Sequence, residues 1–211
     1  MMTLLVSLIG GDMEEFNSKL YWEKRYATGG NSGAGSYEKF AEFKSAVLNE
    51  FVKVNNIDSV IELGCGDGNQ LSYADYNFYI GVDVSPSAIN ICKQKFINDV
   101  RKSFLISDEL KEHRADLAIS LDVIFHLVED VVFFNYMKQL FSVADKYVVI
   151  YSSNTDDNES SPKHIKHRNI EKYISGHFPN WLQTNKINNI YPYTGDHLTG
   201  SFSDFYIYQR R

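Results

Sequence analysis

The sequence predicts an α/β fold, a three-layer sandwich around a mostly parallel seven-stranded sheet. Apolar runs of strand length alternate with helical stretches from residue 57 to residue 176, an order typical of parallel strands joined by crossover helices. A glycine-rich turn at 64–68 connects the first run to a short helix, and two more strand-like runs follow the last helix. With 211 residues, the chain is expected to form one domain with a sizeable core.

The N-terminal part is predicted to be helical. Residues 1–12 are expected to be a poorly ordered extension, and 13–211 a single domain whose first part, 13–56, covers one end of the sheet. Apolar side chains at helical spacing predict helices at 14–26 and 37–55. The glycine-rich stretch 27–36 between them is predicted to be a mobile loop. The stripe expected to face the core in the second helix consists of Phe40, Phe43, Val47, Phe51 and Val54.

The remaining elements follow from apolar runs and capping signals. Ser85 is placed to cap a helix that has Pro86 at its first position, and Ile89, Cys92 and Phe96 would face the sheet. The other predicted helices are 69–76, 131–143 and 169–176, and the predicted strands are 57–63, 78–82, 102–106, 116–120, 146–151, 181–191 and 201–209.

The glycine turn after the first strand is the best candidate for a ligand site. Glycine at alternate positions lets the backbone turn tightly and approach a ligand closely. Asp83 follows about 20 residues later, at the end of the next parallel strand, where a carboxylate can accept hydrogen bonds from a ribose diol. A dinucleotide site would need a small residue at position 69, which is Asn69 here. Glu62 and Asp67 add negative charge that opposes a pyrophosphate and suits an ammonium and a sulfonium.

On these residues, the segment from about 57 to 152 resembles the class I S-adenosylmethionine-dependent methyltransferases. Their first motif is similar to 62–68 here, and their second ends in an acidic residue like Asp83. The resemblance implies S-adenosylmethionine as cofactor and a sheet that ends in an antiparallel hairpin. The alternative is a glycine-rich turn in some other α/β domain. The residues expected to bind the cofactor are Trp22, Arg25, Tyr26, Glu62, Gly64, Cys65, Gly66, Gly68, Asp83, Val84, Asp108 and Leu121.

Several of these assignments have an open alternative. Trp22 and Tyr26 resemble the lid of small-molecule methyltransferases, where they would pack on the cofactor while Arg25 pairs with its carboxylate. Alternatively, the aromatic rings pack only on the core and Arg25 is solvated. Asp108 could accept a hydrogen bond from the adenine amine, or it could cap a turn.

Asp122 and His126 are the candidate catalytic residues. The segment resembles the fourth motif of the family, and the four-residue spacing puts both side chains on one face if the segment is helical. They are therefore predicted to act as a general-base pair, although a histidine in an apolar run can also be a satisfied core residue. The segment lacks the tetrapeptide of DNA amino-methyltransferases, an Asp or Asn followed by two prolines and an aromatic residue.

A basic run at 163–168 is the candidate acceptor site. His164, His167 and Arg168 are predicted to bind an anionic acceptor, because they follow a long polar loop at the carboxyl end of a strand. The alternative is a solvated helix start. No metal is expected, since the two histidines lack a third ligand in a plausible pattern.

Composition limits the possible partners. The net charge of −6 argues against an extended phosphate-backbone footprint, so nucleic acid is not expected as a partner. Two cysteines without a disulfide or C-x-x-C pattern fit a reducing cytoplasm, and no apolar run reaches the length of a membrane span. The oligomeric state is left open.

The predicted function is methyl transfer to a small, anionic metabolite, with O-methylation as the expected reaction. Resemblance to methyltransferases of bacterial surface-polysaccharide biosynthesis favours a phosphorylated or nucleotide-linked sugar. The alternatives are an RNA or protein methyltransferase, and a binding module that keeps the fold without the chemistry.

Overall fold

The computed structural model describes residues 16–211. The extension expected at 1–12 and the beginning of the first predicted helix lie outside these residues. The helices within 16–211 are α1 (Ser18–Ala27), α2 (Glu38–Val54), α3 (Pro86–Lys95), α4 (Asp130–Ser142) and α5 (Ile170–His177). Short 3₁₀ turns are η1 (Ala34–Ser36), η2 (Gln70–Tyr73), η3 (Ser107–Glu109) and η4 (Ile124–His126).

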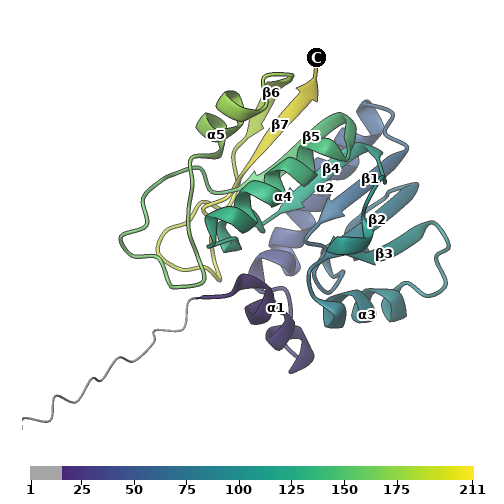
Figure 1. The fold of residues 1–211 in the computed structure, drawn as a ribbon, viewed down its shortest axis with the longest axis horizontal. Coiled ribbons are helices and arrows are strands. Elements are labelled where there is room, and N and C mark those ends of the chain that lie inside the picture. Colours follow the sequence, from purple (N-terminus) through teal and green to yellow (C-terminus); the bar gives the residue numbers. More distant parts are fainter. Residues whose placement is uncertain (1–15) are drawn as a thin grey trace, which may run out of the picture.

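In the described part of the chain, seven strands form one sheet in the order β3-β2-β1-β4-β5-β7-β6. The first five of these pair in parallel, whereas β7 runs antiparallel to both of its neighbours. The predicted α/β fold with a final antiparallel hairpin is therefore confirmed (Figure 1). The strands are β1 (Ser59–Leu63), β2 (Phe78–Asp83), β3 (Lys102–Ile106), β4 (Ala115–Leu121), β5 (Ala144–Ser152), β6 (Trp181–Ile187) and β7 (Asp204–Arg210).

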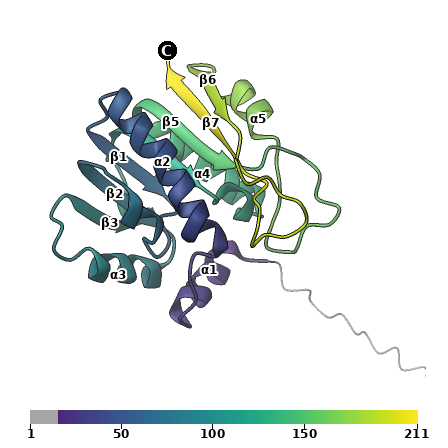
Figure 2. The ribbon, with the colours of Figure 1, turned by 180° about the vertical axis from the view of Figure 1, so that it is seen from behind.

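Helices cover both faces of the sheet. α4 and α5 lie on the face seen in Figure 1, and α2 crosses the opposite face, seen in Figure 2. The core accordingly has two clusters, one beneath α4 and α5 and one beneath α2 and α3. Because both faces of β4 and β5 are covered, these strands are continuous apolar runs rather than alternating ones.

Several predicted boundaries are wrong for identifiable reasons. The helix expected at 69–76 is only the turn η2, because the side chain of Asn49 bonds the carbonyl of Tyr73 and the N–H of Asp75. The strands expected at 181–191 and 201–209 are shorter at the hairpin end, where 188–203 form a loop. Val54 is 65% exposed, so the buried stripe of α2 continues instead through Leu48 and Val52.

The start of α3 follows the prediction and fixes the end of β2. The Ser85 hydroxyl accepts from the N–H of Ala88, and Pro86 occupies the first turn. Ile89 and Cys92 are buried against the sheet. This cap turns the chain directly after Asp83, so that its carboxylate stays at the carboxyl edge of the sheet. No helix within residues 16–211 has the length and apolar character needed to cross a membrane.

Candidate functional site

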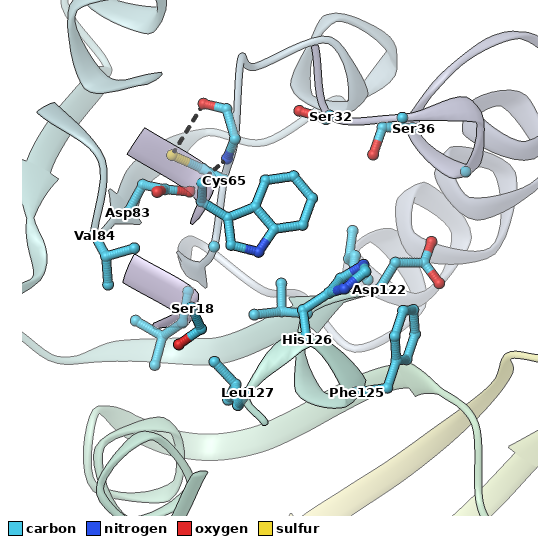
Figure 3. Close-up of a pocket in the computed structure, with 18 of the residues that line it drawn as sticks. Ser18, Ser32, Ser36, Cys65, Asp83, Val84, Asp122, Phe125, His126 and Leu127 are labelled. Carbon is cyan, nitrogen blue, oxygen red and sulfur yellow. Dashed lines mark hydrogen bonds between the residues drawn. The ribbon is translucent and has the colours of Figure 1, made fainter. Parts of the chain in front are cut away.

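A cavity of about 560 Å³ opens at the carboxyl ends of β1, β2 and β4. α1 and the loop at 28–37, together called the lid here, cover it. This volume lies within the usual range for small-molecule sites, and the carboxyl edge is where open α/β sheets bind ligands. Figure 3 shows Cys65, Asp83 and Val84 on one side of the cavity, and Asp122, Phe125 and His126 on the other.

The glycine turn is shaped by close contacts with the elements that face it. Gly64 and Gly66 have positive φ angles of 82° and 55°. A Cβ on Gly64 would lie 2.4 Å from the Val123 side chain, and one on Gly66 would lie 2.3 Å from the Ser32 hydroxyl. Only glycine fits both positions. Gly68 packs instead against α3 and does not line the cavity.

Two buried carboxylates line the cavity beside the turn. The Asp83 oxygens accept hydrogen bonds from the N–H groups of Gly66 (3.0 Å) and Ser85 (2.9 Å). Burial nevertheless raises the pKa of Asp83 to about 6. Burial likewise raises the pKa of Glu62 to about 7, although it accepts a 2.6 Å hydrogen bond from the Tyr79 hydroxyl. Both groups keep acceptor sites for the hydroxyl or ammonium groups of a ligand.

Asp67, the acidic residue within the glycine turn, has a different role from Glu62 and Asp83. Its carboxylate accepts hydrogen bonds from the N–H groups of Ser32 and Asn69 and from the Tyr37 hydroxyl, and its own N–H donates to the Ser32 hydroxyl. Burial would raise the pKa of Asp67, but these donors outweigh it and hold the pKa below its usual value. Asp67 thus links the lid loop to the glycine turn through hydrogen bonds. It does not line the cavity.

The lid helix brings three predicted residues to the cavity. Trp22, Arg25 and Tyr26 all line it. The Trp22 ring lies 5.9 Å from the Tyr26 ring and 4.9 Å from the His126 ring, and the Arg25 guanidinium lies 5.6 Å from the Trp22 ring centre. The aromatic rings therefore span both sides of the cavity.

The lid helix is also fixed at its outer face. The Glu23 carboxylate accepts hydrogen bonds from the hydroxyls of Ser85 and Ser87 at the start of α3. These bonds hold the pKa of Glu23 below its usual value. Sequence patterns alone did not suggest this contact, since Glu23 looks like an ordinary solvent-facing residue of an amphipathic helix.

The predicted cofactor residues are brought together with two exceptions, Gly68 and Asp108. Cys65, Val84 and Leu121 line the cavity with the residues already described. Asp108 is exposed in η3 and lies off the cavity, and its neighbour Ser107 lines it instead. In the turn η3, which follows β3, the residue at the cavity is therefore Ser107, whereas the sequence predicted Asp108.

Asp122 and His126 do not lie on one helical face, contrary to the prediction. The segment forms the short turn η4 rather than an α-helix, and the Asp122 oxygens accept from Lys44 and Ser203, each at 2.8 Å. The His126 Nδ1 lies 3.1 Å from the His164 carbonyl oxygen. Burial lowers the pKa of His126 to about 4, so its imidazole is neutral at physiological pH. Both side chains line the cavity independently.

The basic run does not form the predicted anion site. Arg168 donates to the carbonyls of Leu127 and Val128 and to the Asp130 carboxylate, and Lys166 pairs with the same carboxylate at 2.8 Å. These bonds join the run to the start of α4, so the Arg168 side chain is 12% exposed.

The two histidines of the run differ in position. His164 lines the cavity, where its ring stacks 5.8 Å from that of His126. His167 lies off the cavity, with its Nδ1 2.7 Å from the Ser153 hydroxyl. Burial lowers the pKa of both imidazoles.

Sequence reasoning missed several residues of the cavity wall. Phe125, His197, Ser201 and Phe202 line its acceptor side, together with Phe40 from α2. The loop at 188–203 supplies three of them. No local sequence pattern indicated that these side chains would reach the cavity.

Comparison with protein families gives a match over the centre of the chain. Residues 61–142 match a model described as "Methyltransferase domain". This range contains the glycine turn, β2, β4 and the segment with Asp122 and His126. A comparison with curated proteins found no match to this sequence.

Solved structures share the fold at low identity. N-methyltransferase NodS from Bradyrhizobium japonicum WM9 with S-adenosyl-L-homocysteine is 14% identical, with a TM-score of 0.71 over 92% of this chain and 99% of that chain. Magnesium protoporphyrin IX methyltransferase from Synechocystis PCC 6803 with bound S-adenosylmethionine is 15% identical, with a TM-score of 0.64 over 93% and 98%. An S-adenosylmethionine-dependent methyltransferase from Clostridium acetobutylicum ATCC 824 is 14% identical, with a TM-score of 0.60 over 83% and 93%.

The matched domain and the fold agree on the reaction class but not on an acceptor. The similar structures are not specifically polysaccharide enzymes, so that part of the expectation is not supported by them. With a match to a methyltransferase domain over residues 61–142 and the sheet order of these enzymes, the chain has the class I methyltransferase fold.

Proposed function

We propose that this methyltransferase methylates a hydroxyl oxygen of a small, sugar-type acceptor, with the cofactor on the glycine-turn side of the cavity. The observation that carries the proposal is one cavity with two chemically different sides. Two buried carboxylates and a glycine turn lie on one side, and aromatic rings with a neutral imidazole lie on the other.

The residues of the first side fit S-adenosylmethionine. The Asp83 carboxylate suits the ribose hydroxyls, and Glu62 suits the ammonium of the methionine part. Gly64 and Gly66 provide the close backbone approach that a Cβ would block. Trp22 and Tyr26 suit packing against the cofactor, and Arg25 suits its carboxylate.

The cofactor supplies a methyl group that is already activated on its sulfonium. The protein therefore contributes mainly alignment, which can be worth roughly 7–11 kcal/mol when the reacting groups are held together. His126 is neutral and lines the acceptor side, so it can take the proton that a hydroxyl loses on methylation.

The acceptor side favours a ring that carries hydroxyl groups. Phe125 and Phe202 offer apolar faces, whereas His197 and Ser201 offer hydrogen-bonding groups. The phosphate or nucleotide group expected from the sequence loses its main support, because Lys166 and Arg168 already bond Asp130. The proposal therefore concerns the sugar ring and its hydroxyls, in keeping with the resemblance to surface-polysaccharide enzymes.

Calorimetry with S-adenosylhomocysteine tests the cofactor side. Wild-type protein should bind it, and Asp83→Asn should weaken binding about tenfold or more, because one charge-assisted acceptor is lost. Asp116→Asn is the matched control, since Asp116 lies at the opposite end of the sheet and pairs with Lys146. Absence of binding by folded wild-type protein at millimolar ligand contradicts the proposal.

A screen for methyl transfer tests the acceptor side. Neutral sugars, sugar phosphates and simple phenols are incubated with labelled S-adenosylmethionine, and methylated products are identified by mass spectrometry. The proposal expects O-methylated sugars among the products. Transfer only to nitrogen, or only to acceptors without a sugar ring, contradicts it.

A further inference from the structure

The Asp122 carboxylate lies where three elements of the acceptor side meet. Its Oδ2 accepts from the Lys44 ammonium of α2 at 2.8 Å, and its Oδ1 accepts from the Ser203 hydroxyl, just before β7, at 2.8 Å. Its own N–H donates to the carbonyl of Tyr151 on β5 at 2.9 Å. Asp122 also has a positive φ of 59°, which aspartate tolerates better than most residues.

Lys44 compensates the charge of this carboxylate from inside the core. Its side chain is 0% exposed, and its ammonium lies 5.3 Å from the Tyr151 ring centre. A buried lysine is costly unless its charge is paired. The pair with Asp122 therefore holds a negative charge at a fixed place on the cavity wall.

The carboxylate retains free acceptor capacity towards the cavity. A carboxylate has about four lone-pair sites, and side-chain hydrogen bonds occupy two of those on Asp122. The Asp122 side chain is 16% exposed and lines the cavity. The lid passes close by, since a Cβ on Gly35 would lie 3.0 Å from the Asp122 Oδ2. A hydrogen-bond donor on the acceptor can thus meet a fixed, charged acceptor oxygen there.

We infer that Asp122 binds a second hydroxyl of the acceptor and thereby selects substrates that carry at least two hydroxyl groups. This inference rests on the proposed function. Because the Asp122 carboxylate is held by the Lys44 ammonium and by the Ser203 hydroxyl, each at 2.8 Å, it anchors the substrate while His126 takes the proton. Lys44 is a positioning residue, because it acts only through Asp122. The acceptor class is therefore a diol or polyol rather than a lone alcohol.

The experiment measures binding of matched sugars to protein saturated with S-adenosylhomocysteine. The probes are the methyl glycosides of glucose, galactose and mannose, each compared with its singly deoxygenated derivatives by ligand-observed NMR titration. Wild-type protein should bind a parent glycoside about ten- to hundredfold more tightly than one of its deoxy derivatives, the usual effect of losing a hydrogen bond to a charged group. Asp122→Asn should reduce this ratio to near one.

Two further variants keep the test decisive. Asp116→Asn, a matched aspartate paired with Lys146, should preserve the wild-type ratio. If Asp122→Asn does not fold, the double variant Lys44→Met with Asp122→Gly removes both charges and suits the positive φ. That variant should also lose the preference for the parent sugar.

The outcomes separate this inference from the proposed function. If wild-type protein binds no parent glycoside more tightly than its deoxy derivatives, or if Asp122→Asn keeps the preference, the inference is overturned. Failure of S-adenosylhomocysteine binding would overturn the proposed function itself. If the cofactor binds but Asp122→Asn keeps the wild-type ratio of affinities for the parent and deoxy glycosides, only the role of Asp122 is overturned.

Discussion

Asp83 and Glu62 titrate near neutrality because they are buried beside the glycine turn. Their pKa values are raised, to about 6 and about 7, so both carboxyls become protonated as the pH falls through that window. Only the charged forms can use every oxygen as an acceptor for ribose hydroxyls and an ammonium. Affinity for the cofactor should therefore be highest above about pH 7.5 and decrease towards pH 5.

Calorimetry with S-adenosylhomocysteine from pH 5 to pH 8.5 at constant ionic strength measures this dependence. The dissociation constant should rise at least tenfold between pH 7.5 and pH 5, because Asp83 is then mostly protonated. Asp83→Asn should lose the part of the dependence centred near pH 6. A dissociation constant that stays level over this range would show that the carboxylates do not face the cofactor.

His126 behaves in the opposite sense, because burial lowers its pKa to about 4. Its imidazole stays neutral from pH 5 to pH 8, so the form that can accept a proton is present throughout this range. His126→Ala should reduce kcat about 10²- to 10⁴-fold with a hydroxyl acceptor while the affinity for S-adenosylhomocysteine is unchanged.

Added imidazole and a control variant complete this measurement. Free imidazole should restore part of the activity of His126→Ala, since it can occupy the vacated space and take the proton. His177→Ala on α5 is the control, because His177 is exposed and does not line the cavity. An unchanged kcat in His126→Ala would remove the histidine from the reaction.

Among contacts between secondary-structure elements, hydrogen bonds from Arg168 connect the segment before α5 to the start of α4. Its hydrogen bonds reach two backbone carbonyls and Asp130, and its guanidinium lies 4.3 Å from the Phe133 ring centre. Arg168→Ala should therefore destabilise the protein by about 1.5–3 kcal/mol, as expected for loss of hydrogen bonds to a charged group. Thermal unfolding measures this change, with Lys163→Ala as an exposed control.

The same variant distinguishes a structural role from acceptor binding. Arg168→Ala should leave the ratio of KM values for a sugar and its phosphate unchanged. A selective rise in KM for the phosphate would restore the anion site that the sequence suggested.

The elements also show which features could be predicted and which could not. Strands β1, β2, β4 and β5 are buried on both faces, so their apolar runs were recognisable without tertiary information. The glycine turn and Asp83 were predictable because their spacing is local. The bonds of Arg168 with Asp130 join residues 38 positions apart, and no local pattern encodes such a contact.

The burial of Lys44 could have been predicted from the sequence, but its partner could not. It lies between Phe40 and Leu48 at intervals of four residues, so helical periodicity already placed this lysine on the buried face of α2. A charged residue at such a position needs a charged partner, which was a usable signal. Its partner, however, is Asp122 at the end of β4, and only the folded sheet brings the two together.

For the whole molecule, cofactor binding should be coupled to unfolding. The cavity is built from β1, β2, β4 and the lid, so an unfolded chain has no equivalent site. S-adenosylhomocysteine at a hundredfold excess over its dissociation constant should stabilise the protein by about 2.7 kcal/mol. For a domain of this size, that corresponds to a rise in Tm of roughly 5–10 °C.

Differential scanning fluorimetry across ligand concentrations measures this rise. The shift should increase with the logarithm of ligand concentration in wild-type protein and in Asp116→Asn. Asp83→Asn should need about ten times more ligand for the same shift. A Tm independent of ligand would mean that the cofactor site is not part of the cooperative unit.

The hydrogen bonds of the lid have a consequence for the order of events in a catalytic cycle. Asp67 holds Ser32 and Tyr37, and Ser85 and Ser87 hold Glu23, so the lid is bonded both to the glycine turn and to the helix after β2. Exchange of spent for fresh cofactor has to break contacts that methyl transfer leaves intact. We expect product release to limit steady-state turnover, with a rapid first round of methylation before the slower cycles that follow.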